Sequence, residues 1–215
     1  MNKQFIAIIL VVVVGLFGVL MFTRDDKKNE GSGAETTAQA TNHTLGQGTK
    51  NITLIEYGDF QCPACKAFYP IVKQIKADYG DEIKFQFRHY PLVQIHPNAF
   101  MSSRAAEAAG LQGKFFEMHD LLYENQEAWA NTTDPTDTFV SFAGQIGLNA
   151  DKFRSDLTSK AVADSINADT KAAQDAGANS TPTFVLNGKK IDQNPQSIED
   201  FKKLIDEEIA RSSNL

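Results

Sequence analysis

Hydrophobic residues follow two different periods along the chain. Residues 52–57 and 83–90 are rich in β-branched and aromatic residues, which is typical of strands with a buried face. Between them, residues 62–79 place their apolar side chains mostly on one face of a helix, and Gly80 marks its end. A strand, a helix and a second strand in this order predict a right-handed βαβ unit with parallel strands.

Helical patterns dominate the part of the chain that follows. Helices are expected at about residues 98–111, 114–129, 136–146, 150–157 and 160–176. This is too much helix for a simple crossover between two strands. We therefore expect a helical subdomain, at about residues 97–177, inserted into the sheet domain.

Strand and turn signals return near the carboxyl terminus. Residues 183–186 form an apolar strand, and the Asn187-Gly188 pair that follows them is the strongest short signal for a hairpin. A final amphipathic helix spans about residues 197–210. The expected fold class is α/β, in the order βαβ, helical insertion, β-hairpin and helix.

The amino terminus carries an uncharged apolar run at residues 5–22. Its eighteen residues would reach roughly 27 Å as a helix, close to the thickness of the hydrocarbon core of a bilayer. No small-residue cleavage site follows, so we expect a single-pass signal anchor over residues 1–23 rather than a cleaved signal peptide. Polar residues 24–50 predict a flexible linker, and the folded domain is expected over residues 51–211.

Basic residues flank the apolar run on both sides, so charge counting alone does not orient it. Only a few residues precede the apolar run, and a large polar part of the chain follows it. This arrangement favours export of the domain to the extracytoplasmic side of the cell membrane. The net charge of −6 gives no electrostatic case for binding nucleic acid.

The chain has two cysteines, Cys62 and Cys65. One C-x-x-C supplies only half of a four-thiolate zinc site, and the four histidines lack zinc-finger spacing, so no metal is expected. Cys62 opens the predicted helix ahead of Pro63, where the helix dipole and unpaired N–H groups favour a thiolate. We expect Cys62 to be exposed and nucleophilic, with Cys65 buried about one turn further along. An idle thiol pair or an inert disulfide is the alternative.

Thr181-Pro182 precedes the hairpin strand and is a candidate for a cis peptide bond beside the cysteines. An ordinary proline ahead of a strand explains the pair equally well. His89 and His96 lie near the end of the second strand and the start of the insertion. They either flank a groove or serve as structural residues.

Three motifs resemble one family. They are G-D-F-Q-C-P-A-C-K, the segment Y-P-L…H-P-N-A, and S-T-P-T-F-V-L-N-G-K. Together they resemble the DsbA-like branch of the thioredoxin superfamily over residues 51–210. The resemblance implies a thioredoxin fold with an inserted helical domain. It also implies Cys62 as nucleophile, Cys65 as resolving thiol, Pro182 in cis and Thr181 lining a peptide-binding groove.

Glu56 matches the buried acid that thioredoxin-like proteins hold beneath the disulfide. In that position it would exchange a proton with Cys65, whereas the alternative is an ordinary solvent-facing carboxylate. The dipeptide between the cysteines, Pro63-Ala64, departs from strongly oxidising members of the family, which often carry a histidine there. A threonine at the position of Thr181 is also found in relatives that reduce or isomerise disulfides.

The favoured function is an oxidase that donates its Cys62–Cys65 disulfide to unfolded or reduced exported proteins. It would need no cofactor beyond that redox-active disulfide, and a membrane redox partner would recycle the pair. Residues 5–22 would hold the protein in the lipid bilayer. The alternatives are a disulfide reductase or isomerase of the same fold, or a non-catalytic anchored chaperone or binding module.

Overall fold

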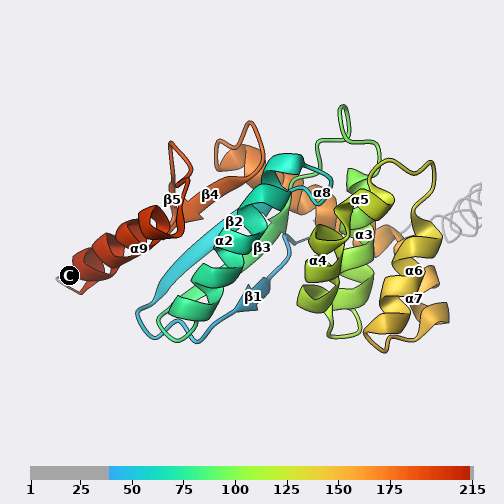
Figure 1. Ribbon diagram of the computed structural model, residues 1–215, viewed down its shortest axis with the longest axis horizontal. Coiled ribbons are helices and arrows are strands. Elements are labelled where there is room, and N and C mark those ends of the chain that lie inside the picture. The colour runs from blue at the N-terminus through green and yellow to red at the C-terminus, as the bar shows by residue number, and fades with distance from the viewer. Residues whose placement is uncertain (1–38, 214–215) are drawn as a thin grey trace, which may run out of the picture. The chain divides into compact units, whose positions relative to one another are not determined.

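A five-stranded sheet carries the fold (Figure 1). In the computed structural model, which describes residues 39–213, the strands run in the order β1-β3-β2-β4-β5. β2 and β3 pair in parallel, and every other neighbouring pair is antiparallel. The bounds are β1 (His43–Leu45), β2 (Ile52–Gly58), β3 (Ile83–His89), β4 (Thr183–Leu186) and β5 (Lys189–Lys190).

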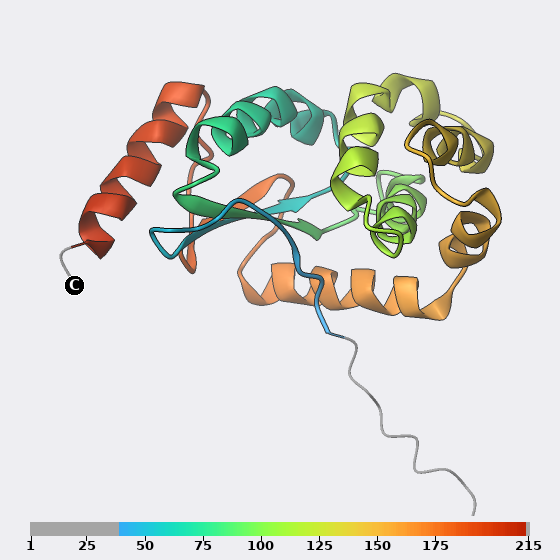
Figure 2. The ribbon, with the colours of Figure 1, turned by 90° about the horizontal axis from the view of Figure 1, so that it is seen from below.

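Helices cover both faces of the sheet (Figure 2). α2 (Pro63–Tyr79) and α9 (Ile198–Ser212) share one face, and α8 (Lys160–Asp175) runs along the other. The remaining helices form the insertion between β3 and α8: α3 (Ala99–Gly110), α4 (Phe115–Glu124), α5 (Gln126–Trp129), α6 (Thr136–Gln145) and α7 (Ala150–Leu157). The predicted order of βαβ unit, helical insertion, hairpin and final helix is confirmed.

Two boundaries differ from the sequence-based expectation. The single helix expected over residues 114–129 is two helices, because Asn125 interrupts it. The Asn125 side chain donates to the backbone oxygen of Leu121, a local bond that competes with helical continuation. α8 was expected within the helical subdomain, yet it packs on β3 and so belongs equally to the sheet layer.

The linker prediction is wrong at its carboxyl end. Residues 43–45 form β1, which pairs with β3 so that His43 lies opposite Phe87. The His43 ring also stacks on Phe115 of α4, with 3.6 Å between ring centroids. A three-residue strand is too short to show a period, and its stability comes from partners far along the chain.

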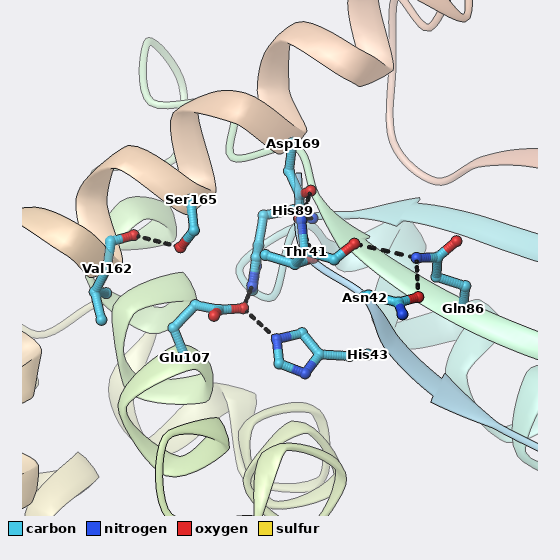
Figure 3. A network of polar contacts seen from close by, with 9 residues as sticks. All are labelled: Thr41, Asn42, His43, Gln86, His89, Glu107, Val162, Ser165 and Asp169. Atoms are coloured by element: carbon cyan, nitrogen blue, oxygen red, sulfur yellow. Dashed lines mark hydrogen bonds and ion pairs between the residues drawn. The ribbon is translucent and has the colours of Figure 1, made fainter. Parts of the chain in front are cut away.

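Two buried carboxylates hold β1, β3 and the helices together (Figure 3). Asp169 accepts hydrogen bonds from the backbone N–H of Thr41 at 2.7 Å, from the Thr41 hydroxyl at 2.6 Å and from the His89 N–H at 2.9 Å. Glu107 Oε1 lies 2.7 Å from His43 Nε2 and 2.8 Å from His89 Nε2. Burial opposes ionisation, but the two histidines outweigh it and lower the pKa of Glu107 to about 2.

An aromatic core joins the sheet to the insertion. Phe60, from the loop after β2, stacks on Phe87 of β3 with 4.9 Å between ring centroids, and lies 5.0 Å from Tyr123 of α4. All three side chains are almost fully buried. The loop that precedes the cysteines is therefore packed between the sheet and the helical insertion.

Within residues 39–213, no helix is long and apolar enough to cross a membrane. The anchor expected over residues 1–23 and most of the expected linker lie outside the described residues.

Asp169→Asn should lower the free energy of unfolding by about 2 kcal/mol. The NH₂ group of the new amide would face the buried N–H and O–H groups that now donate to the carboxylate, and one of these donors would lose its acceptor. Urea unfolding measures the change. Asp164→Asn, which alters an exposed pair with Lys160 on the same helix, should shift stability by less than about 0.5 kcal/mol. Equal effects of the two substitutions would contradict the assigned role of Asp169.

Candidate functional site

Cys62 is the residue directly before the first turn of α2. Its backbone is extended, with φ −67° and ψ 124°, and Pro63 takes the first helical position. Proline is favoured there because the N–H that it lacks would have no partner within the helix. The predicted placement of Cys62 at a helix amino terminus is confirmed. Pro63 and Ala64 are exposed beside it.

Both cysteines are free thiols, and both are buried. Cys65 is fully buried, as expected, but Cys62 is only 7% exposed, so the prediction of an exposed nucleophile is wrong. The Cys62 thiol donates to the backbone oxygen of Thr181 at 3.5 Å. The covering segment comes 119 residues later in the chain, which is why the local pattern around Cys62 does not reveal it.

The pKa values of the two thiols are shifted in opposite directions. Hydrogen bonds from the Cys65 thiol, the Thr181 side chain and the backbone N–H groups of Cys65 and Ala64 together lower the pKa of Cys62 to about 5, against the opposing effect of burial. Burial, followed by the bond to Cys62, raises the pKa of Cys65 well above its ordinary value. At neutral pH the pair therefore holds one thiolate, on Cys62.

The Thr181–Pro182 peptide bond is cis, as predicted. The Pro182 carbonyl accepts a hydrogen bond from the Asn194 side chain at 2.7 Å. The Thr181 hydroxyl is buried and has no hydrogen-bond partner of ordinary geometry among the described residues. It is thus available to donate to the Cys62 thiolate when the thiol ionises.

Glu56 is buried in β2, with 2% of its surface exposed, and so does not face solvent. Its Oε1 atom has no hydrogen-bond partner among residues 39–213. Burial raises the pKa of Glu56 to about 8, although the positive charge of Lys76 on α2 acts in the opposite direction. The negative charge of Glu56 also contributes to the raised pKa of Cys65. The two groups therefore interact in a region that excludes water.

Sequence reasoning missed a group of buried amides around the cysteine loop. Gln126 of α5 donates to the backbone oxygen of Phe60 at 2.7 Å and to that of Cys62 at 3.1 Å. Gln61 donates to the backbone oxygen of Ala130 at 2.7 Å. The sequence did offer a signal for Gln61, because it is a polar residue directly before Cys62. Gln126 gave none, because it reaches the loop only through the fold.

Among the described residues, no group of three or more His, Cys, Asp or Glu side chains is arranged to hold a metal ion. The reactive side chains that the structure places at this site are the two thiols.

A family model described as Thioredoxin matches residues 38–207. The chain belongs to the thioredoxin family. Solved structures similar to this thioredoxin-family chain include oxidised BdbD from Bacillus subtilis, with a TM-score of 0.68 and 24% identity over 81% of this chain and 97% of that one. α-DsbA1 from Wolbachia pipientis has a TM-score of 0.67 and 22% identity, over 80% and 92% of the two chains. These likenesses establish a mixed α/β thioredoxin-like fold with a helical insertion.

Curated relatives of the chain are much longer proteins. One named Na(+)/H(+) antiporter NhaA 3, from Salinispora tropica, is 38% identical over 148 residues, which are 69% of this chain and 22% of that protein. A second, Na(+)/H(+) antiporter NhaA from Herminiimonas arsenicoxydans, is 32% identical over 149 residues, again 69% of this chain and 23% of that protein. The chain thus spans about a fifth of the length of these relatives.

Glu56→Gln should change how stability depends on pH. The pKa of Glu56 is about 8 in the folded protein against 4.5 for an ordinary glutamate, so the folded state binds this proton more tightly between those values. Through this group, the free energy of unfolding of the wild type falls as pH rises from about 5 to about 8. The variant lacks this loss and should gain about 3 kcal/mol relative to the wild type across that interval.

Urea unfolding of the reduced proteins at the two pH values measures this difference. Because the comparison is between variant and wild type, the titration of Cys62 is common to both and largely cancels. A stability difference that does not change with pH would contradict the raised pKa of Glu56.

Proposed function

We propose that this protein is a thiol–disulfide oxidoreductase that works through Cys62 and Cys65. The observation that carries the proposal is the unequal pair of thiols at the amino terminus of α2. Cys62 has a pKa of about 5 and lies against Thr181, whereas Cys65 is fully buried and its pKa is raised. A pair kept only for structure has no need of this asymmetry.

Each step of the proposed exchange follows from these acidities. A client thiolate attacks Cys62 Sγ in the Cys62–Cys65 disulfide, forms a mixed disulfide and expels Cys65 as a thiolate. Because Cys65 is a strong base, it takes up a proton, which protonated Glu56 supplies. A second client thiolate then attacks the client sulfur of the mixed disulfide and releases Cys62 as a stable thiolate. Two electrons pass from the client to the pair.

The low pKa of Cys62 favours the oxidase direction. Stabilising the thiolate stabilises the reduced protein, and a pair whose reduced form is stable is a stronger oxidant. Pro63-Ala64 contains no histidine to supply this stabilisation. Instead, the Cys65 thiol, the Thr181 side chain and the backbone of the first helical turn lower the pKa of Cys62.

The proposal extends to where the protein works. The uncharged run at residues 5–22 would anchor the chain in the cell membrane, with the described domain on the extracytoplasmic side. Its clients would be unfolded or reduced exported proteins, and a membrane redox partner would re-oxidise the pair. Sodium–proton antiport is not part of the proposal, because the matched region is only about a fifth of those relatives.

Replacing the resolving thiol tests the exchange chemistry. Cys65→Ser, with Cys62 first converted to a mixed disulfide with 5-thio-2-nitrobenzoate, should trap mixed disulfides between Cys62 and reduced client proteins that carry one cysteine. The client thiolate attacks Cys62 Sγ and expels thionitrobenzoate, and the second thiol of the pair, which could release the client, is gone. Non-reducing gel electrophoresis and mass spectrometry of the adducts measure this. Cys62→Ser/Cys65→Ser is the matched control and should trap none. If Cys65→Ser forms no more covalent adduct than the control, the cysteines are structural, and the chain is better described as a binding module.

A further inference from the structure

A buried amide from the helical insertion bonds to the backbone of the nucleophile itself. Gln126 is the first residue of α5, and only 6% of its surface is exposed. Its Nε2 atom donates to the backbone oxygen of Phe60 at 2.7 Å and to that of Cys62 at 3.1 Å. One side chain thus holds the carbonyls on both sides of Gln61, in the loop that leads from β2 into α2.

The insertion fixes the backbone from which Gln126 projects. At the end of α5, the Asn98 side chain donates to the backbone oxygens of Trp129 and Ala130, each at 3.2 Å. The Trp129 side chain is fully buried, and its indole N–H donates to the backbone oxygen of Leu122 in α4 at 3.0 Å. The short helix is therefore bonded to α3 and α4, and the amide of Gln126 is held in one place.

The direction of the Cys62 carbonyl determines how α2 faces the reactive sulfur. Cys62 has ψ 124°, and rotation about this angle moves its carbonyl together with the whole start of α2 relative to Sγ. The backbone N–H groups of Ala64 and Cys65, in the first helical turn, bond to that sulfur. Its carbonyl accepts from the Lys66 N–H at 3.1 Å as well as from Gln126. The bond from Gln126 therefore opposes a rotation that would turn the donors away.

This support matters most when the cysteine pair is reduced. In the disulfide form, the bond between the two sulfur atoms itself fixes Cys62 against Cys65. In the dithiol form, which this structure represents, both thiols are free. Hydrogen bonds and packing alone then keep the donors at Cys62. An interaction that stabilises the reduced protein more than the oxidised protein makes the pair a stronger oxidant.

We infer that Gln126 is a positioning residue for the exchange reaction: it holds the Cys62 carbonyl, keeps the amino terminus of α2 aimed at Sγ and so makes the pair more oxidising. This inference rests on the proposed thiol–disulfide exchange. The dipeptide Pro63-Ala64 offers no side-chain donor, so the reduction potential depends in part on backbone donors whose direction Gln126 controls. The helical insertion thereby adjusts the chemistry of a cysteine pair carried by the sheet domain.

Gln126→Met removes the donor but keeps the length of the side chain. In glutathione buffers at about pH 7, the equilibrium constant for reducing the disulfide of the full-length variant should be about tenfold lower than in the wild type, a potential about 30 mV more negative. The Cys62 thiolate, followed by its ultraviolet absorbance, should form at about tenfold lower proton concentration. Gln126→Asn, whose amide is one methylene further from the carbonyls, is a milder variant in case Gln126→Met fails to fold, and its shifts should be smaller and in the same direction.

Urea unfolding separates positioning from simple stabilisation of the fold. Relative to the wild type, Gln126→Met should raise the equilibrium constant of unfolding about tenfold more in the reduced protein than in the oxidised protein at about pH 7. The pKa of Cys62 is about 5, so at about pH 4 its thiol is mostly protonated in both proteins, and this gap should close. An equal loss of stability in the two redox forms at both pH values would mean that Gln126 only stabilises the fold, which overturns the inference.

Gln61→Met is the matched control. Gln61 is also a buried amide, 7% exposed, that ties the cysteine loop to the insertion. It donates to the backbone oxygen of Ala130 at 2.7 Å and accepts from the Asn98 N–H at 2.6 Å, and neither bond involves the Cys62 carbonyl. Gln61→Met should destabilise both redox forms alike and keep the redox equilibrium constant within about twofold of the wild-type value. A shift as large as that of Gln126→Met would overturn the role assigned to the bond between Gln126 and Cys62.

Failure of the inference and failure of the proposed function give different results. The redox equilibrium with glutathione and the ionisation of Cys62 are both measured without a client protein. If the wild type and Gln126→Met share the same potential and the same pKa of Cys62, the inference is refuted and the exchange chemistry stands. If the wild type equilibrates with glutathione but exchanges with no client protein, the proposed function fails, whereas the comparison between the two proteins still decides the role of Gln126.

Discussion

The unequal surroundings of two thiols one helical turn apart are the constraint on which the rest of the site depends. Donors converge on Cys62 from the start of α2 and from Thr181, whereas Cys65 is sealed from water beneath it and shares that region with Glu56. Hydrogen bonding therefore favours the charged form of one sulfur, and burial opposes it at the other. The chemistry of exchange follows from this difference.

The helical insertion maintains that geometry. Gln126 bonds to the carbonyl of Cys62 itself, and Phe60 is wedged between β3 and α4. The backbone carrying the nucleophile is thus fixed by elements on both sides, and the N–H groups at the helix terminus stay aimed at the sulfur. Preorganised donors of this kind stabilise charge without reorganising during the reaction. The insertion is therefore a support for the reactive loop as well as a covering layer.

Local patterns predicted the βαβ unit, the helical insertion, the hairpin at Asn187-Gly188 and the position of Cys62, because each depends on residues close together in the sequence. The resemblance to the thioredoxin superfamily supplied Pro182 in cis and the buried Glu56. Features built from distant segments escaped prediction. Asp169 holds Thr41 just before β1, Glu107 holds His43 within it, and Thr181 covers Cys62; no local period reveals these contacts.

The reduction potential of the Cys62–Cys65 pair tests the account most directly. It is measured by equilibrating the full-length protein with glutathione buffers and quantifying the dithiol and disulfide forms. Because the Cys62 thiolate stabilises the reduced protein, the account predicts an oxidising potential, above about −200 mV. A potential near about −270 mV, typical of a reductant, would contradict the proposed oxidase and favour a reductase of the same fold.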